Sequence, residues 1–274
     1  MIAVRLLYRP ELLRTDAAFM GAVPGAWSVA DTVLSVRRGE LVIPRLFAYP
    51  YPRALDNDLA ALKARPLNDA RAYRFCEDVL AWTAALGDLT PRAWANFAEI
   101  PDNLPVIVKG AHADKGRWAQ MYADGRAAAI ELRSELWRDT GMRSEAIVAR
   151  EYVPLRRLGE SAVGGCPPSE EWRIFVVDGV VVGGAPYWPP DDCETPCGPV
   201  SEVDPGWIAR AVGAVTTACP SLRWIALDVG RTDAGRLYVI EVSDGQRAGI
   251  PDGMPDEDVR AMLHRMAAVL EGAR

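Results

Sequence analysis

The alternation of apolar and polar positions predicts most of the secondary structure along this chain. The runs 171–188 and 223–245 each hold two β-rich stretches around a turn sequence, which predicts two hairpins, and Asp178-Gly179 is a strong hairpin signal. Apolar residues at three- and four-residue spacing predict helices. We expect helices at 56–65, at 70–86, at 124–141, after an N-cap at Asp204, and at 255–271.

The remaining segments indicate how these elements are organised. Residues 33–50 read as two strands joined by a turn at Arg38-Gly39, and the proline-punctuated segment 90–105 is the expected domain boundary. After it come a strand at 106–110, a helix, a further strand at 145–155 and the two hairpins. This order predicts an α+β fold rather than a doubly wound parallel sheet.

Length, charge and cysteine usage narrow the class of protein. A chain of 274 residues can bury a large core, and its net charge of −6 argues against a nucleic-acid-binding surface, which is normally basic. No apolar run approaches the roughly 20 residues of a membrane span, and Arg5 breaks the first apolar run, unlike a secretory signal. The five cysteines lack metal-type spacing. We expect a cytoplasmic protein with free thiols.

The second hairpin carries a candidate metal site. If Ala234-Gly235 is a two-residue turn, Asp228 lies directly opposite Glu241, with Cβ atoms about 4.5–5.5 Å apart. Two opposed carboxylates repel unless a cation lies between them, and oxygen ligands of this kind suit Mg²⁺. A solvent-facing sheet with exposed acids explains the pair equally well. In this register the residues expected on the opposite, apolar face are Leu227, Val229, Ile240 and Val242.

The first hairpin places an acid and a base on one face. Alternation puts Glu171, Arg173 and Phe175 on one side of the strand. Arg173 could bind a phosphate and Glu171 a ribose hydroxyl, while a cross-strand salt bridge is an equally good structural explanation.

Lysine is rare in this chain, and its placement is informative. Two of the three lysines, Lys109 and Lys115, lie six positions apart, one at the end of an apolar strand and one in a glycine-containing loop. A compact ammonium group suits a phosphate at such positions, whereas a guanidinium group prefers planar bidentate partners. Solvated loop lysines are the alternative. Neither common phosphate-binding motif is present in the sequence.

Four segments in order resemble the ATP-grasp family. They are "PVIVKGAHADKGRW", "AIVAREYVPL", "EWRIFVVDGVVVGGAPY" and "IALDVGRTDAGRLYVIEVSDGQ", within residues 104–250. More narrowly, the set is similar to the clade named for one arginine and two lysines in its nucleotide site. The resemblance implies ATP held between two α+β subdomains, 96–154 and 155–274, with a small N-terminal α/β domain at 1–95.

The resemblance also implies roles for individual residues. Lys109, Lys115 and Arg173 would contact the phosphates and act in catalysis, and Glu171 would meet the ribose. The backbone of Glu151, Tyr152 and Val153 would form the hinge that contacts adenine. Asp228 and Glu241 match the magnesium acids of the family.

The second acid is followed by a departure from the family pattern. The family usually has an asparagine two residues later, where this chain has Ser243, a weaker metal ligand. Asp244 would point to the opposite face if the strand continued. Because Gly245 suggests that the strand ends there, we expect Asp244 to swing in as the third metal ligand.

The resemblance implies an ATP- and Mg²⁺-dependent ligase. Such an enzyme joins a small-molecule or peptide carboxylate to an amine or thiol through an acyl phosphate, with release of ADP and phosphate. A kinase on the same scaffold and a nucleotide-binding regulatory protein without turnover are the alternatives. We expect neither a membrane nor a nucleic-acid partner, and a homodimer is compatible with the sequence.

Overall fold

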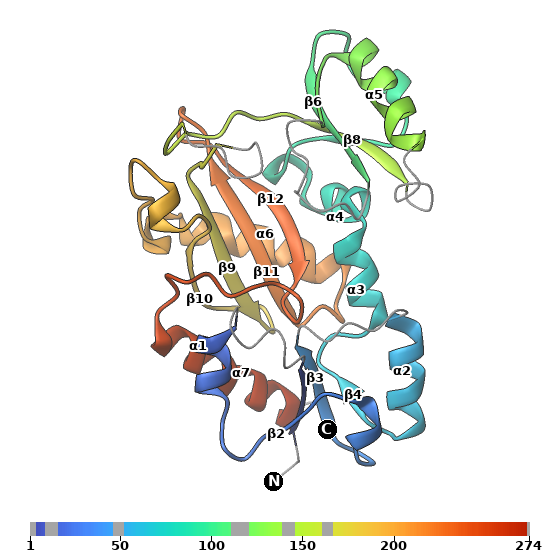
Figure 1. Ribbon diagram of the computed structural model, residues 1–274, viewed down its shortest axis with the longest axis vertical. Helices are drawn as coiled ribbons and strands as arrows, with labels where there is room; N and C mark the ends of the chain where they lie inside the picture. Colours follow the sequence, from blue (N-terminus) through green and yellow to red (C-terminus); the bar gives the residue numbers. More distant parts are fainter. Residues whose placement is uncertain are drawn as a thin grey trace.

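Three four-stranded sheets are stacked along the long axis of the molecule (Figure 1). The structure is a computed structural model that describes residues 4–8, 16–45, 52–110, 121–138, 146–160 and 167–272. Within these ranges, no helix is both long and apolar enough to cross a membrane.

The N-terminal sheet is parallel throughout, with the strand order β2-β1-β3-β4. The expected pair of strands within 33–50 is wrong for its first half, because a single 3₁₀ turn occupies that position and only the later segment pairs in the sheet. The elements of this unit are β1 (Val4–Tyr8), α1 (Ala17–Ala22), β2 (Ser28–Ala30), β3 (Leu41–Arg45), α2 (Pro52–Ala61) and β4 (Arg65–Pro66), with the 3₁₀ turn at Val33–Ser35.

The central sheet is antiparallel and has the order β10-β9-β11-β12. One of its faces is apolar over most of its length and packs against α3, α4 and α6. The elements are α3 (Ala70–Glu77), α4 (Val79–Leu86), β9 (Glu171–Val177), β10 (Val180–Pro186), α6 (Pro205–Ala218), β11 (Trp224–Arg231) and β12 (Leu237–Asp244), with 3₁₀ turns at Gly87–Leu89, Pro190–Asp192 and Val200–Glu202.

The opposite face of the central sheet changes character along the strands. Its lower half, which includes Phe175, Val177 and Trp224, is buried against α7 (Asp256–Gly272) and the N-terminal sheet. Its upper half carries the charged residues Arg173, Asp228 and Glu241. The sequence therefore divides this face into a core half and a polar half by residue type alone.

The third sheet has the order β5-β8-β6-β7 and one helix on its outer face (Figure 1). Val106, Val108 and Ala149 pack under this helix, so the alternate residues of β6 and β8 face inward, toward the central sheet. The elements are β5 (Ala93–Trp94), β6 (Pro105–Gly110), β7 (Tyr122–Asp124), α5 (Arg126–Arg138) and β8 (Ile147–Glu151), with a 3₁₀ turn at Phe97–Glu99.

The two predicted hairpins are present, but their turns differ. Asp178 and Gly179 form a two-residue turn in which both residues have positive φ, 51° and 75°, as the dipeptide predicts. The second hairpin has a three-residue loop, because Thr232 N–H donates to Arg236 O. A β-bulge then shifts the register between Asp228 and the next residue of β11.

The expected single helix at 70–86 is wrong, because the helix is interrupted at Asp78 and two helices form instead. Asp78 has extended backbone angles, and its carboxylate accepts hydrogen bonds from the N–H groups of Leu80 and Ala81. A side chain that caps a new helix in this way ends the previous one. Both helices pack in the core of the central sheet, and β5 pairs with β8, so we propose that the N-terminal unit ends near residue 69 rather than at 95.

A buried arginine, paired with an acid of its own unit, joins the N-terminal unit to the segment that follows the central sheet. Arg45 on β3 and Asp16 are both fully buried and lie 2.6 Å apart. The guanidinium group of Arg45 also donates to the carbonyl oxygens of Gly245 and Ala248, just after β12. These contacts fix the position of the segment that follows β12.

Candidate nucleotide and metal site

The polar half of the central sheet brings together most of the charged residues that the sequence singles out. Arg173 on β9 pairs in register with Asp228 on β11, and Asp228 pairs with Glu241 on β12. Directly paired residues share a face of the sheet. Asp228 therefore lies between the arginine and the second acid; the sequence predicts its pairing with Glu241 but not its pairing with Arg173.

Arg173 and Asp228 form a bidentate ion pair. The Nε and Nη2 atoms of Arg173 each donate to one carboxylate oxygen at 2.8 Å, and the Asp228 side chain is almost completely buried. Burial by itself lowers the pKa of Arg173, but the Asp228 carboxylate outweighs it and raises that pKa above its ordinary value. Arg173 also lies over the Tyr187 ring and donates to Gly249 O. The two charges are thus held in one geometry.

Glu241 is opposite Asp228 because two departures from a simple hairpin cancel. The three-residue loop shifts the register by one residue, and the bulge shifts it back, so Asp228 pairs with Glu241 while Val229 pairs with Val239. The extra residue is Ile240. Our expectation that Ile240 faces the apolar core is therefore wrong, and Val239 takes that place.

Ser243 lies on the same face as Glu241, two residues further along β12. Its hydroxyl group donates to Oε1 of Glu241 at 2.8 Å. A hydroxyl donor orients a carboxylate without adding charge. Ser243 can therefore support Glu241 at the position where the family usually has an asparagine.

Asp244 does not join this group. Strand β12 continues through Asp244, so its side chain lies on the opposite face from Glu241. The Asp244 carboxylate accepts hydrogen bonds from the Asn68 amide at 2.6 Å and from the Gln246 N–H at 2.9 Å. Burial raises the pKa of Asp244. The structure does not support the expected swing of Asp244 toward the acid pair.

Glu171 is buried at the end of the polar half. Its Oε1 atom accepts hydrogen bonds from the Ser169 hydroxyl at 2.6 Å and from the Trp188 indole N–H at 2.9 Å. Both donors come from outside β9, and neither was singled out in the sequence. A Trp directly after a strand in a proline-rich segment is too common a pattern to have identified Trp188.

Lys109 lies on the inner face of the upper sheet. It pairs with Val148 across β6 and β8, and both side chains are on the face opposite α5. Lys109 therefore faces the central sheet, where the acids lie. Lys115, the second expected phosphate ligand, lies outside the described residues.

The expected hinge begins at the last residue of β8, and its first two residues are hydrogen-bonded to neighbouring segments. The N–H groups of Glu151 and Tyr152 donate to carbonyl oxygens of Arg92 and Pro105. These two donors are engaged, so any adenine contact falls to the other backbone groups of residues 151–153. The Glu151 carboxylate pairs with Arg92, at 2.9 Å.

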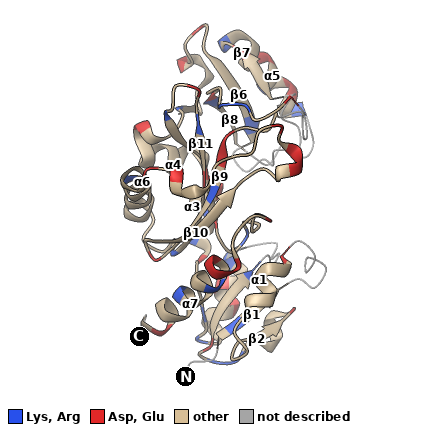
Figure 2. Cartoon of the chain, turned by 90° about the vertical axis from the view of Figure 1, so that its left-hand side faces the viewer, with Lys and Arg blue, Asp and Glu red and all other residues tan. Residues whose placement is uncertain are grey.

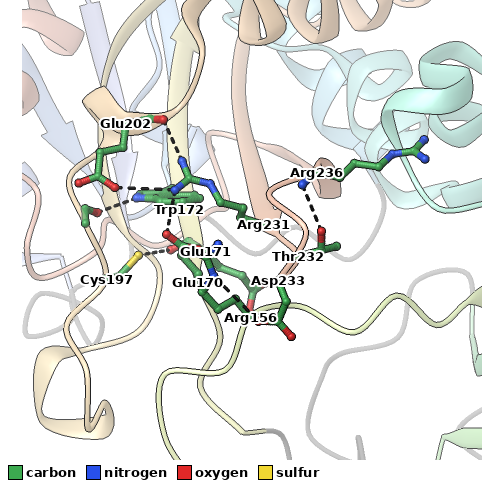
Figure 3. A network of polar contacts seen from close by, with 11 residues as sticks. Arg156, Glu170, Glu171, Trp172, Cys197, Glu202, Arg231, Thr232, Asp233 and Arg236 are labelled. Atoms are coloured by element: carbon green, nitrogen blue, oxygen red, sulfur yellow. Dashed lines mark hydrogen bonds and ion pairs between the residues drawn. The ribbon is translucent and has the colours of Figure 1, made fainter.

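A network of charged side chains anchors the chain beyond the hinge (Figure 3). The carboxylate of Glu170 lies between Arg156 and Arg231, at 2.9 and 3.0 Å. Arg231 also donates to Glu202 O and lies over the Trp172 ring. The segment after the hinge is thus fixed to the ends of β9 and β11.

The acid pair fits a magnesium ion that also binds a polyphosphate. Mg²⁺ commonly uses one or two protein carboxylates together with phosphate oxygens and water. Arg173 donates to both oxygens of Asp228 and Ser243 donates to one oxygen of Glu241, and these hydrogen bonds orient the two carboxylates. Within the described ranges, no group of three or more histidine, cysteine or acidic residues could hold a metal ion by protein ligands alone.

The cysteines that the structure describes are free thiols, as the sequence predicts. Four cysteines are free thiols, and Cys166 lies outside the described residues. Acidic and basic segments are interspersed along the ribbon in the view of Figure 2.

The fold and the acid pair define this protein as an ATP-grasp domain. A family model for the ATP-grasp domain, the third family of the clade named for one arginine and two lysines, matches residues 99–263, more than half of the chain. The chain therefore belongs to the ATP-grasp family and, within it, to this clade, as the four sequence segments predict. A comparison with curated proteins found no match.

Solved structures show the same fold over the whole chain. A D-alanine–D-alanine ligase from Bacillus anthracis, complexed with ATP, has a TM-score of 0.61 at 14% identity and covers 100% of both chains. The D-cycloserine synthetase DcsG has a TM-score of 0.57 at 17% identity, covering 97% of this chain and 100% of that one. The ATP-grasp ligase PsnB, complexed with a minimal precursor, has a TM-score of 0.56 at 13% identity, with 97% and 99% covered. The fold is that of the ATP-dependent ligases of this family.

Proposed function

We propose that this protein uses ATP and Mg²⁺ to join a carboxylate to an amine. The observation that carries the proposal is the row Arg173, Asp228 and Glu241 across three adjacent strands, on the half-face of the central sheet that lies outside the core cluster. A cation beside two acids suits a site that holds both a metal ion and phosphate groups.

The proposed roles follow the positions of the side chains. Asp228 and Glu241 hold Mg²⁺, which neutralises charge on the transferring phosphoryl group. Lys109, from the inner face of the upper sheet, and Lys115 bind the phosphates together with Arg173. We do not retain Asp244 as a metal ligand, because its carboxylate is held on the other face.

We propose that the nucleotide lies between the hinge and the central sheet. We propose that residues 151–153 meet the adenine through their remaining backbone groups and that Glu171 meets the ribose. Ser169 and Trp188 hold the Glu171 carboxylate in one orientation, which reduces the entropy lost on binding.

The reaction needs no nucleophilic side chain. In the first step a substrate carboxylate oxygen attacks the γ-phosphorus of ATP, and ADP leaves with the bonding electrons. In the second step an amine attacks the acyl carbon, phosphate leaves, and the amine loses a proton. Catalysis then consists of positioning and electrostatic stabilisation, which the charged half-face can supply.

The solved relatives indicate where to look for substrates. Their names refer to D-alanine, D-cycloserine and a minimal precursor, and we propose small amino acids and short peptides as the first acids to test. We expect ADP release from the purified protein, ATP and MgCl₂ to require both an acid pool and an amine pool. ADP formed with an acid alone, together with a stable phosphorylated product, would indicate a kinase. Nucleotide binding without ADP release in any pool would indicate a regulatory protein.

A further inference from the structure

Arg150 crosses from the upper sheet to the edge of the central sheet. It lies on β8, one residue before the hinge, on the same inner face as Lys109. Its Nη2 atom donates to Val239 O at 2.9 Å and to the Thr90 hydroxyl at 2.8 Å, and its Nη1 atom donates to Ile240 O. The guanidinium group also lies over the Trp82 ring.

The two carbonyl groups that Arg150 contacts belong to the β-bulge. Consecutive carbonyl groups in a regular strand point to opposite sides, whereas those of Val239 and Ile240 accept from one guanidinium group. Strand β12 is the edge of its sheet, so no further strand among the described residues offers N–H groups on that side. Arg150 and Thr90, which also donates to Val239 O at 2.7 Å, supply the missing donors.

The bulge decides the face on which Glu241 lies. Without the bulge, the three-residue loop would pair Asp228 with Ile240 and place Glu241 opposite Leu227, which faces the apolar core. A shift of one residue moves a side chain to the other face of a sheet. The acid pair therefore exists only while the bulge at Ile240 is maintained.

Burying Arg150 costs free energy, which argues that its contacts have a role beyond packing. The Nε atom of Arg150 is buried and has no hydrogen-bond partner among the described residues. Burial lowers the pKa of Arg150 to about 10, which still leaves the group charged at neutral pH. Burying a charged group costs hydration free energy, which its hydrogen bonds must offset.

We propose that Arg150 is a positioning residue for the metal site. It holds the bulge that turns Glu241 toward Asp228, and it does so from the strand that leads directly into the hinge. The segment proposed to contact adenine and the acid proposed to hold Mg²⁺ are thus connected through one side chain. This inference rests on the proposed function, because it requires that Glu241 binds the metal.

The test compares ADP binding with and without MgCl₂, measured by calorimetry, in the parent protein and in Arg150→Met. We expect Mg²⁺ to strengthen ADP binding by about tenfold in the parent, within the usual range of coupling between two ligands. In Arg150→Met that enhancement should fall to about twofold or less, while metal-free ADP binding changes by less than about threefold. A merely structural residue would alter both affinities together or neither.

Further variants test the role of Arg150 even if Arg150→Met does not fold. Arg150→Lys keeps the charge but loses the two-pronged donor, and should recover only part of the enhancement. Thr90→Val, which removes one donor to the same bulge with little change in shape, should reduce the enhancement in the same direction and decides the matter if Arg150→Met does not fold. Arg126→Met is the matched control, because Arg126 likewise donates to two backbone carbonyl groups but is the first residue of α5, on the outer face of the upper sheet.

The outcomes distinguish the positioning role of Arg150 from the proposed metal site. Full Mg²⁺ enhancement in folded Arg150→Met, or in Thr90→Val and Arg150→Lys together, would overturn the positioning role of Arg150. No Mg²⁺ enhancement in the parent protein would instead overturn the proposed metal site, and with it the proposed function.

Discussion

Glu241→Gln is expected to reduce Mg²⁺-dependent ADP release by about 100-fold or more, the cost typical of removing one group that stabilises the transition state by charge. The substitution keeps the size of the side chain and a hydrogen-bond acceptor for Ser243, but removes the negative charge that faces Asp228. The measurement is the steady-state rate of ADP release over a range of MgCl₂ concentrations.

Asp244→Asn is the matched control for this variant. Asp244 is on the same strand, three residues further along, but its carboxylate is held by Asn68 and Gln246 on the opposite face. The control should lose some stability and keep its Mg²⁺ dependence. If Glu241→Gln retained the parent rate while Asp244→Asn lost it, the assignment of the metal acids would be reversed.

Arg45→Met is expected to lower the free energy of unfolding by about 3–5 kcal/mol, because it leaves the buried Asp16 carboxylate without its partner. The variant also removes the donors that hold the carbonyl groups of Gly245 and Ala248. Urea denaturation of both proteins, under conditions where unfolding is reversible, measures the difference.

The comparison for Arg45 is an exposed ion pair in the same protein. Arg223 and Asp178 lie 3.0 Å apart with both side chains partly in solvent, so Arg223→Met should cost at most about 1 kcal/mol. A loss below about 1 kcal/mol for Arg45→Met would show that the N-terminal unit does not depend on this buried pair.

Local signals were sufficient for much of the fold and for part of the site. The Asp178-Gly179 turn, the N-cap at Asp204 and the alternation in β9 depend on neighbours in sequence, and each is present as predicted. Strand periodicity also predicts that Glu171, Arg173 and Phe175 share a face of β9, whereas the pairing of Arg173 with Asp228 on β11 does not follow from it.

The pairing of Asp228 with Glu241 was predicted correctly from an incomplete argument. The assumed two-residue turn is a three-residue loop, and only the bulge at Ile240 restores the register. No local signal marks this bulge. Its carbonyl groups are satisfied by Arg150 and Thr90, which lie 90 and 149 residues away in the chain.

The position of the Asp244 side chain also depends on contacts with residues that are distant in the sequence. A glycine after an acid suggests the end of a strand, and this reading is reasonable from the sequence. The strand nevertheless continues through Asp244, because Asn68 and Gln246 provide donors for its carboxylate. A contact between residues 176 positions apart cannot be derived from local spacing. A charged residue inside an apolar strand, as at Arg150, is a sequence signal that can point to a long-range partner.

A thermal-unfolding scan with MgCl₂ alone, with ATP alone and with both tests most directly whether nucleotide and metal share the site between the two sheets. A ligand at about 100 times its dissociation constant adds about 2.7 kcal/mol, which shifts the unfolding midpoint of a protein of this size by several degrees. We predict a shift with ATP and Mg²⁺ together that exceeds the sum of the separate shifts, and that Lys109→Met loses most of it. An unchanged midpoint at millimolar ATP and MgCl₂ would contradict the proposed site.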